Sequence, residues 1–224
     1  KYSSINSCIS FVPSLNGKQL LIVEDLVSKD GTLHPVQDAM VKYHGSQCGF
    51  CTPGFVMSLF SMFKNNKSYN SELITDSISG NLCRCTGYRP IIDAAKSLNK
   101  SNKNDEFSKN KNKIIKLLKT IRPKNTYIKK DNKVYFSPKN INDLKNIIKN
   151  NSNFNFLAGG TDLSLTVTKE RKEIPFIIDL KEINELDFIK VSKNYLEVGS
   201  ATPLIKFEKE IKKYYPDFYS VLKR

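Results

Sequence analysis

Hydrophobic residues at helical spacing dominate the segment from residue 35 to residue 98. A first helix is predicted to begin at Pro35, to repeat apolar residues about every 3.6 positions, and to end at Gly45. Three further helices are expected over about Pro53–Asn65, Ser71–Ser79 and Pro90–Leu98. Four short helices with short connections predict a small helical bundle.

The pattern changes to alternating strands and helices after residue 127. Strand-like apolar runs occur at 133–136, 154–158, 176–180 and 195–199, and helical patterns occur at Ile141–Lys149 and Leu204–Lys213. This order predicts an α+β or α/β domain. Because so few strands are present, we expect the apolar side chains of Phe176, Ile177 and Ile178 to remain uncovered and the sheet edges to be exposed.

Two other segments complete the domain prediction. Residues 99–113 (NKSNKNDEFSKNKNK) are polar and of low complexity, which is typical of a linker. Residues 1–26 contain a short apolar segment, a turn and a strand-like QLLIVE, and resemble the end of a domain. The predicted organisation is therefore the end of one domain over 1–26, a helical domain over 27–100, a linker over 101–122 and an α+β portion over 123–224.

The formal net charge of +14 raises the question of nucleic-acid binding. Residues 101–150 hold 14 basic and 4 acidic side chains, so most of the excess lies around the expected linker. Lysine outnumbers arginine by 31 to 5, whereas bidentate recognition of phosphates or bases favours arginine. The opening residues lack the pattern of a secretory signal, and the richest apolar run, 54–63, is too short to span a bilayer. We therefore expect a cytoplasmic protein with neither nucleic acid nor membrane as a partner.

Four of the five cysteines form two tight pairs, Cys48-x2-Cys51 and Cys83-x-Cys85. Each pair precedes a proline-initiated helix, whose N-terminal N–H groups and partial positive charge can stabilise an anionic centre. Four thiolates suit an iron–sulfur cluster or zinc. Zinc ribbons usually repeat C-x2-C on hairpin knuckles, so the spacing favours an iron–sulfur cluster. A zinc-stabilised, basic nucleic-acid-binding module remains the alternative, and metal content discriminates between the two.

The segments QCGFCTPGFVM (47–57) and GNLCRCTGYRPIIDA (80–94) resemble the helical [2Fe–2S] domain of the xanthine dehydrogenase/molybdenum hydroxylase family. The resemblance implies that Cys48, Cys51, Cys83 and Cys85 bind the cluster nearest the molybdenum cofactor. It also implies that Gln47 contacts the pterin of molybdopterin. Cys8 resembles the fourth ligand of a preceding plant-type ferredoxin domain. The other three ligands are absent from this chain, so Cys8 cannot hold a cluster here by itself.

The segment FNFLAGGTDLSL (154–165) joins a strand, two glycines and the start of a helix. Consecutive glycines let the backbone approach a phosphate, and Thr161 and Asp162 can cap the helix, but this signal is weak alone. In the family, a loop of the form AGGTDL embraces the pyrophosphate of FAD. The resemblance therefore assigns FAD binding to Leu157, Ala158, Gly159, Gly160, Thr161, Asp162 and Leu163. The two histidines, His34 and His44, are expected at the surface or as helix caps.

The expected fold class is multidomain α+β. It would comprise the end of a β-grasp ferredoxin domain, a four-helix [2Fe–2S] bundle, and the N-terminal part of an FAD-binding domain of the PCMH, vanillyl-alcohol-oxidase-like type. The chain resembles an internal fragment of the small iron–sulfur/FAD subunit of a xanthine dehydrogenase-like oxidoreductase. The implied function is electron transfer from a molybdenum centre on a partner large subunit, through [2Fe–2S] clusters, to FAD and then NAD, in a heteromeric assembly. No catalytic residue is expected in this chain, and a purine substrate is implied by the family alone.

Overall fold

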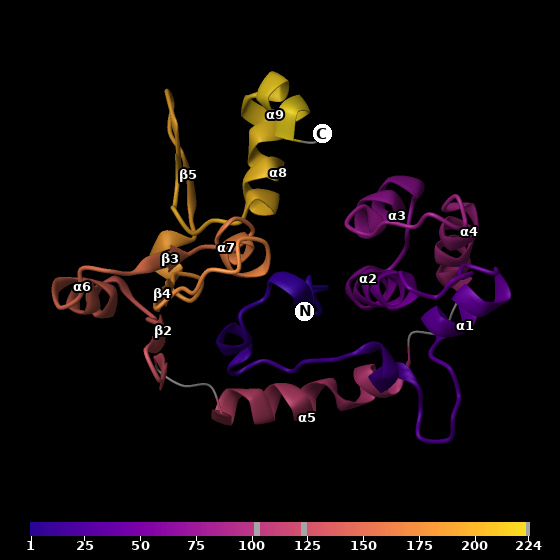
Figure 1. Ribbon diagram of the computed structural model, residues 1–224. Coiled ribbons are helices and arrows are strands. Elements are labelled where there is room, and N and C mark those ends of the chain that lie inside the picture. Colours follow the sequence, from indigo (N-terminus) through magenta and orange to yellow (C-terminus); the bar gives the residue numbers. More distant parts are fainter. Residues whose placement is uncertain (101–103, 122–124, 223–224) are drawn as a thin grey trace. The chain divides into compact units, whose positions relative to one another are not determined.

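The computed structural model describes residues 1–100, 104–121 and 125–222, and the chain divides into two compact units (Figure 1). The first unit comprises Lys1–Ile5 and Lys18–Thr120, and the second comprises Asn6–Gly17 and Ile121–Arg224. The N-terminal residues thus contribute to both units. None of the helices in the described ranges is long and apolar enough to cross a membrane.

The first unit is a bundle of helices around α2. Its helices are α1 (Pro35–Lys42), α2 (Thr52–Asn65), α3 (Ser71–Ile78), α4 (Arg89–Ser97) and α5 (Glu106–Ile121), with 3-10 turns η3 (Val23–Leu26) and η4 (Leu98–Lys100). The side chains of Phe55, Leu59 and Phe63 recur every four positions along α2 and are fully buried. Helices α1 to α4 begin and end within three residues of the predicted positions, because proline, asparagine and glycine mark their ends.

Helix α5 occupies most of the segment expected to be a linker. Residues 101–103 and 122 of that linker lie outside the described residues, but Glu106–Ile121 forms a 16-residue helix. Asp105 caps it, since its carboxylate accepts the backbone N–H of Ser108 at 2.8 Å. The lysine- and asparagine-rich composition led to the linker prediction, although the segment also contains apolar residues at helical spacing, among them Ile114, Leu118 and Ile121.

The strand expected over residues 19–24 does not form. These residues run without regular structure into the 3-10 turn η3. A strand needs a neighbouring strand to take its backbone hydrogen bonds, and no strand of the described chain pairs with this segment. The preceding residues also lack strands and form the short turns η1 (Ser7–Ile9) and η2 (Val12–Leu15).

The second unit is built on a mixed four-stranded sheet with the order β1-β2-β4-β3. The sheet contains β1 (Thr126–Lys130), β2 (Lys133–Ser137), β3 (Asn155–Leu157) and β4 (Phe176–Asp179), and the crossover helices are α6 (Ile141–Lys149) and α7 (Leu163–Thr168). Strands β1 and β2 are antiparallel, whereas β4 runs parallel to both β2 and β3. A hairpin of β5 (Ile189–Val191) and β6 (Leu196–Val198), the turn η5 (Asn184–Leu186), and helices α8 (Leu204–Tyr214) and α9 (Pro216–Leu222) complete this unit.

Both faces of this sheet are covered, so the expectation that its apolar side chains remain uncovered is wrong. Phe176, Ile177 and Ile178 are only 9%, 6% and 0% exposed. Helix α6 packs over Phe176 and Ile178. On the opposite face, Ile177 belongs to a cluster against which Phe11 of the N-terminal segment packs. That segment is also held by a hydrogen bond of 2.6 Å from the Ser164 hydroxyl to the carbonyl of Ile9.

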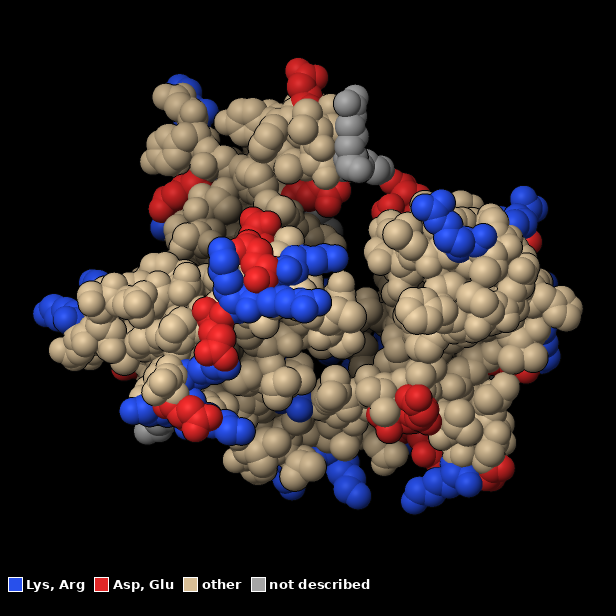
Figure 2. Space-filling view, viewed as in Figure 1, with Lys and Arg blue, Asp and Glu red and all other residues tan. Residues whose placement is uncertain are grey.

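Acidic and basic side chains are mixed on the face shown in Figure 2, rather than separated into one continuous basic surface. Several lysines of the second unit have carboxylate partners close in space. Lys133 lies 2.6 Å from Glu173, and Lys139 lies 2.9 Å from Glu182. The positive charge of the second unit is thus partly neutralised locally.

Candidate functional site

The two cysteine pairs, which are far apart in sequence, meet in the first unit. Cys85 Sγ lies 3.5 Å from Cys48 Sγ, and the thiol of Cys51 donates a hydrogen bond to the sulfur of Cys83. Each close contact therefore joins one cysteine of the first pair to one of the second. This happens because Cys51 immediately precedes α2 and Cys85 lies in the loop that leads into α4. All five cysteines of the chain are free thiols.

The four sulfurs form two close pairs and not a single tetrahedron. In the part of the chain that the structure describes, no group of three or more histidine, cysteine or acidic side chains is close enough to hold one metal ion. A zinc ion bound to four sulfurs at about 2.3 Å places every sulfur–sulfur distance at about 3.8 Å. Two separate pairs suit a centre with two metal atoms, each held by two thiolates, and so fit a [2Fe–2S] cluster better than zinc.

Left-handed backbone conformations shape both cysteine loops. Gly49, between the first two cysteines, has φ +83°, and Gly87 has φ +64°. Tyr88 has φ +67°, which is uncommon for a residue with a side chain. Its hydroxyl accepts the backbone N–H of Cys83 at 3.0 Å, and its ring packs edge-on against Phe55. These contacts hold Tyr88 in this conformation and tie the loop to α2.

Hydrogen bonds make the thiol of Cys83 acidic. The Thr86 hydroxyl lies 3.2 Å from Cys83 Sγ, and the backbone N–H groups of Thr86 and Cys85 also point to this sulfur. Together they lower the pKa of Cys83 to about 7. The thiolate, which is the form that binds metal, is therefore readily available at this position.

The second close pair also contains one acidic thiol. The backbone N–H of Phe50, and then the thiol of Cys85, donate to Cys48 and lower its pKa. The hydrogen bond that Cys85 donates to Cys48 raises the pKa of Cys85 itself. Burial likewise raises the pKa of Cys51. Each close pair thus combines a sulfur that loses its proton easily with one that donates to it.

A glycine on α2 allows the second cysteine loop to approach the helix. The Asn81 side chain donates to the hydroxyl of Ser58 at 2.8 Å. A Cβ atom added at Gly54 would lie only 2.6 Å from Asn81 Oδ1. Glycine at position 54 is therefore required for the observed distance between the loop and α2.

The remaining residues expected near this site lie at its surface or elsewhere. Gln47 is exposed beside Cys48. Phe50 is 96% exposed and Leu82 is 78% exposed, so each cysteine loop presents an uncovered apolar side chain. Cys8 is exposed in η1, which belongs to the second unit, whereas the other four cysteines belong to the first.

The glycine loop of the second unit lies at the C-terminal end of β3, which is where ligands commonly bind on parallel sheets. Gly159 and Gly160 have φ +87° and +86°. No other atom lies within 4 Å of a Cβ built at Gly159, whereas one at Gly160 would lie 2.8 Å from a methyl group of Leu157. The loop therefore leaves space for a ligand above Gly159. Asp162 precedes α7, but its side chain makes no capping hydrogen bond, contrary to the expected capping role.

One cluster of charged residues was not anticipated from the sequence. His34 is only 4% exposed, and its Nε2 lies 3.0 Å from the carboxylate of Asp105. Its Nδ1 accepts the N–H of Val36, so His34 caps α1 as expected but is not at the surface. Lys64 Nζ lies 2.6 Å from the same carboxylate. A separation of 71 residues between His34 and Asp105 leaves no local signal for this contact.

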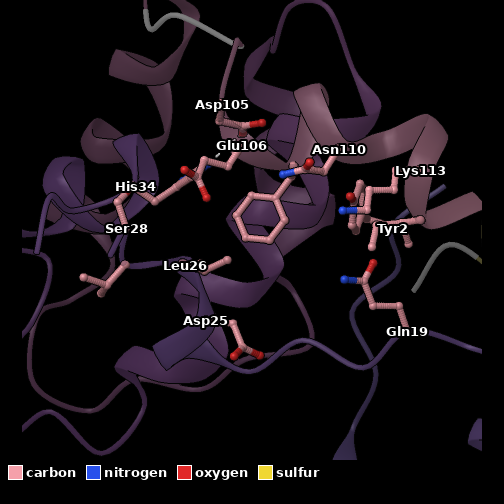
Figure 3. Close-up of a pocket in the computed structure, with 13 residues that line it drawn as sticks. Tyr2, Gln19, Asp25, Leu26, Ser28, His34, Asp105, Glu106, Asn110 and Lys113 are labelled. Atoms are coloured by element: carbon pink, nitrogen blue, oxygen red, sulfur yellow. Dashed lines mark hydrogen bonds and ion pairs between the residues drawn. The ribbon is translucent and has the colours of Figure 1, made fainter. Parts of the chain in front are cut away.

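A pocket of about 360 Å³ lies beside this cluster (Figure 3). His34, Asp105 and Glu106 line it together with Tyr2, as Figure 3 shows. His44, the other histidine, is exposed with φ +53°. The buried His34–Asp105–Lys64 cluster thus holds the start of α5 to the helical bundle.

Comparison with known protein families divides the chain into two parts, as the structure does. Residues 22–96 match the family described as "[2Fe-2S] binding domain". Residues 127–224 match the family described as "FAD binding domain in molybdopterin dehydrogenase". The first match contains all four cysteines of the two close pairs, and the second contains the glycine loop.

Individual relatives also include enzymes of the xanthine dehydrogenase and aldehyde oxidase type. The xanthine dehydrogenase of Blastobotrys adeninivorans is 53% identical over 42% of this chain and 7% of its own length. The aldehyde oxidase 1 of Oryctolagus cuniculus is 45% identical over 45% of this chain and 8% of its own length. The xanthine dehydrogenase 2 of Arabidopsis thaliana is 28% identical over 90% of this chain and 19% of its own length. The chain therefore spans about a fifth or less of the length of these relatives.

Proposed function

Because this chain belongs to the molybdenum hydroxylase family, carrying its iron–sulfur and flavin parts, we propose that it transfers electrons from a molybdenum centre through [2Fe–2S] clusters to FAD and then NAD. The observation that carries this proposal is the meeting of four thiols as two close pairs. Such an arrangement matches the ligand set of a two-iron cluster. The cluster, when bound, takes up and releases single electrons.

We assign one iron to Cys48 and Cys85 and the other to Cys51 and Cys83. The 3.5 Å between Cys48 Sγ and Cys85 Sγ supports the first pairing, and the hydrogen bond between Cys51 and Cys83 supports the second. In each pair, one thiol of lowered pKa supplies a thiolate readily. The starts of α2 and α4 place backbone N–H groups near the resulting negative charge.

The flavin assignment uses the loop from Leu157 to Leu163. The open space above Gly159 and the positive φ angles of Gly159 and Gly160 support a close approach of the FAD pyrophosphate. We assign residues 27–100 to the cluster domain, 101–122 to the connection and 123–224 to the start of the flavin domain. In the same scheme, residues 1–26 end a ferredoxin domain whose cluster Cys8 would help to bind in the whole protein.

The molybdenum centre is proposed to lie on a partner large subunit, in a heteromeric assembly. The exposed apolar side chains of Phe50 and Leu82, one on each cysteine loop, support a docking surface there. Gln47, exposed beside Cys48, is positioned to contact molybdopterin on that partner. The relatives include both xanthine dehydrogenases and aldehyde oxidases. We favour a xanthine dehydrogenase-type reaction because xanthine dehydrogenase 2 aligns with 90% of this chain.

A cytoplasmic location is also part of the proposal. Ligation requires four reduced cysteines, and disulfides are rare in the cytosol. The alternative function, a zinc-stabilised nucleic-acid-binding module, needs four sulfurs around one ion and a continuous basic surface. The paired sulfurs favour electron transfer over that alternative.

Metal content tests the proposed function directly. The full chain, reconstituted anaerobically with iron and sulfide, should contain about two irons and about two acid-labile sulfides, and its reduced form should give the paramagnetic signal of a [2Fe–2S] centre. Cys83→Ser should abolish this signal, whereas the matched variant Cys8→Ser should retain it. Tight binding of a single zinc ion, without a sulfide-dependent chromophore, would support the alternative and refute the proposal.

A further inference from the structure

We propose that Thr86 is a positioning residue that raises the reduction potential of the cluster by donating a hydrogen bond to the thiolate of Cys83. This inference rests on the proposed function, because it requires a cluster at the four cysteines. The observation behind it is the 3.2 Å distance between Thr86 Oγ1 and Cys83 Sγ.

The surrounding contacts determine which atom donates. The backbone N–H of Tyr88 donates to Thr86 Oγ1 at 3.2 Å, so this oxygen already acts as an acceptor. A threonine hydroxyl has one proton, and a metal-bound thiolate has none. The hydroxyl proton of Thr86 is therefore directed to Cys83 Sγ. The backbone N–H of Cys83 in turn donates a hydrogen bond to the Tyr88 hydroxyl, so that Cys83, Thr86 and Tyr88 form a closed ring of hydrogen bonds.

This hydrogen bond acts differently on the two redox states. Reduction adds one electron and one negative charge to the site, and no covalent bond forms or breaks. A hydrogen bond to sulfur is stronger when the sulfur is more negative, so it favours the reduced state and raises the potential. Cys83 is only 7% exposed, and limited solvent access strengthens this electrostatic effect.

The chain supplies a matched control in its other cysteine loop. Thr52 follows Cys51 just as Thr86 follows Cys85, and both dipeptides precede proline-initiated helices. The Thr52 hydroxyl, however, lies 2.6 Å from the hydroxyl of Ser46. Thr52→Val therefore makes the same chemical change close to the cluster without removing a hydrogen bond to sulfur.

The test is a potentiometric titration of the reconstituted full chain with dithionite, followed by paramagnetic resonance. Iron and sulfide contents are measured first in each protein. At the wild-type midpoint potential, Thr86→Val should lower the ratio of reduced to oxidised cluster about fivefold, since the lost hydrogen bond is present in both redox states and only its extra strength in the reduced state affects this ratio. Thr86→Ser, which keeps the hydroxyl, and Thr52→Val should each change this ratio by less than about twofold.

The outcomes separate this inference from the proposed function. If Thr86→Val loads a cluster whose midpoint is unchanged, or if Thr52→Val shifts it equally, Thr86 has no such role and the cluster assignment stands. If the wild-type chain takes up no iron and sulfide, both are wrong. If Thr86→Val fails to load a cluster, Thr86→Ala is compared with Thr86→Ser, and equal midpoints in these two overturn the inference.

Discussion

Replacing Asp105 by asparagine tests how the start of α5 is attached to the helical bundle. The carboxylate of Asp105 lies 2.6 Å from Lys64 Nζ and 3.0 Å from His34 Nε2. It also accepts the backbone N–H of Ser108 at 2.8 Å. The side chains of Asp105, Lys64 and His34 are only 10%, 7% and 3% exposed. Water therefore cannot easily replace these contacts.

The size of the expected effect follows from the ion pair. Burial opposes ionisation of Asp105, but hydrogen bonds from His34 and Lys64 outweigh it and hold the pKa of this carboxyl well below its usual range. Asparagine would leave the ammonium of Lys64 without a counter-charge. Breaking a buried ion pair by removing one partner costs about 3–5 kcal/mol. Lys64 keeps a hydrogen bond of 2.6 Å to the Ser108 hydroxyl, so we expect a loss of about 3 kcal/mol.

Urea denaturation of the full chain, followed by far-ultraviolet circular dichroism, measures this loss in the transition of the helical unit. Glu106→Gln is the matched control, because Glu106 is the next carboxylate along the chain, is exposed and lines the same pocket (Figure 3). Its cost should be below about 1 kcal/mol. Adding Lys64→Met to Asp105→Asn should recover part of the lost stability, because no buried charge then remains unpaired. If Asp105→Asn costs no more than Glu106→Gln, the buried ion pair does not attach α5 to the bundle.

Three further predictions concern stability. Because the pKa of Asp105 is lowered in the folded state, its stabilising contribution is present above about pH 4 and is lost as the pH falls through the folded pKa. In urea unfolding below pH 4, the free energy of unfolding should therefore fall more steeply with pH for wild type than for Asp105→Asn. Gly54→Ala should destabilise the helical unit by about 1–3 kcal/mol and lower iron incorporation, although alanine normally favours a helix. The control Gly80→Ala places its methyl group in open space and should change the free energy of unfolding by less than about 0.5 kcal/mol. Tyr135→Phe removes the buried hydroxyl that donates to Asp179 at 2.5 Å and should cost the second unit about 1–3 kcal/mol in urea unfolding; an unchanged midpoint would contradict this role.

The sequence was most informative where local chemistry marks the ends of elements. Proline at the start and glycine or asparagine near the end located α1 to α4 within three residues. The same reasoning failed over Glu106–Ile121, where polar composition predicted a linker but a helix forms. This helix is held in place because Asp105 caps it and ties its start to His34 and Lys64. Such contacts depend on residues far apart in sequence, which a local pattern does not contain.

The four strands predicted after residue 127 form, but one strand predicted before it does not, and the reason is related. The segment 19–24 has the composition of a strand but has no neighbouring strand in the described chain. In contrast, the polar strand β1 was not predicted, yet it forms because β2 supplies its hydrogen bonds over five residue pairs. The covering of Ile177 by Phe11 likewise joins residues more than 150 positions apart. Pairing and coverage are therefore the parts of this fold that single segments could not reveal.

The two cysteine loops illustrate the same limit at the candidate site. Spacing predicted that four cysteines would meet, but it did not indicate which sulfurs would be neighbours. Both loops contain Cys-Thr, yet Thr52 directly precedes Pro53, whereas Gly87, Tyr88 and Arg89 separate Thr86 from the proline of α4.

These three additional residues change what the second threonine can reach. Gly87 and Tyr88 adopt positive φ angles, and the backbone N–H of Tyr88 donates to the Thr86 hydroxyl. The chain therefore turns back, and Thr86 contacts the sulfur of Cys83. In the first loop, α2 begins at Thr52 and leaves no room for such a turn, so Thr52 contacts Ser46 instead. Loops that look equivalent in sequence thus give their sulfurs unequal hydrogen bonding, and that inequality is what the comparison of Thr86→Val with Thr52→Val measures.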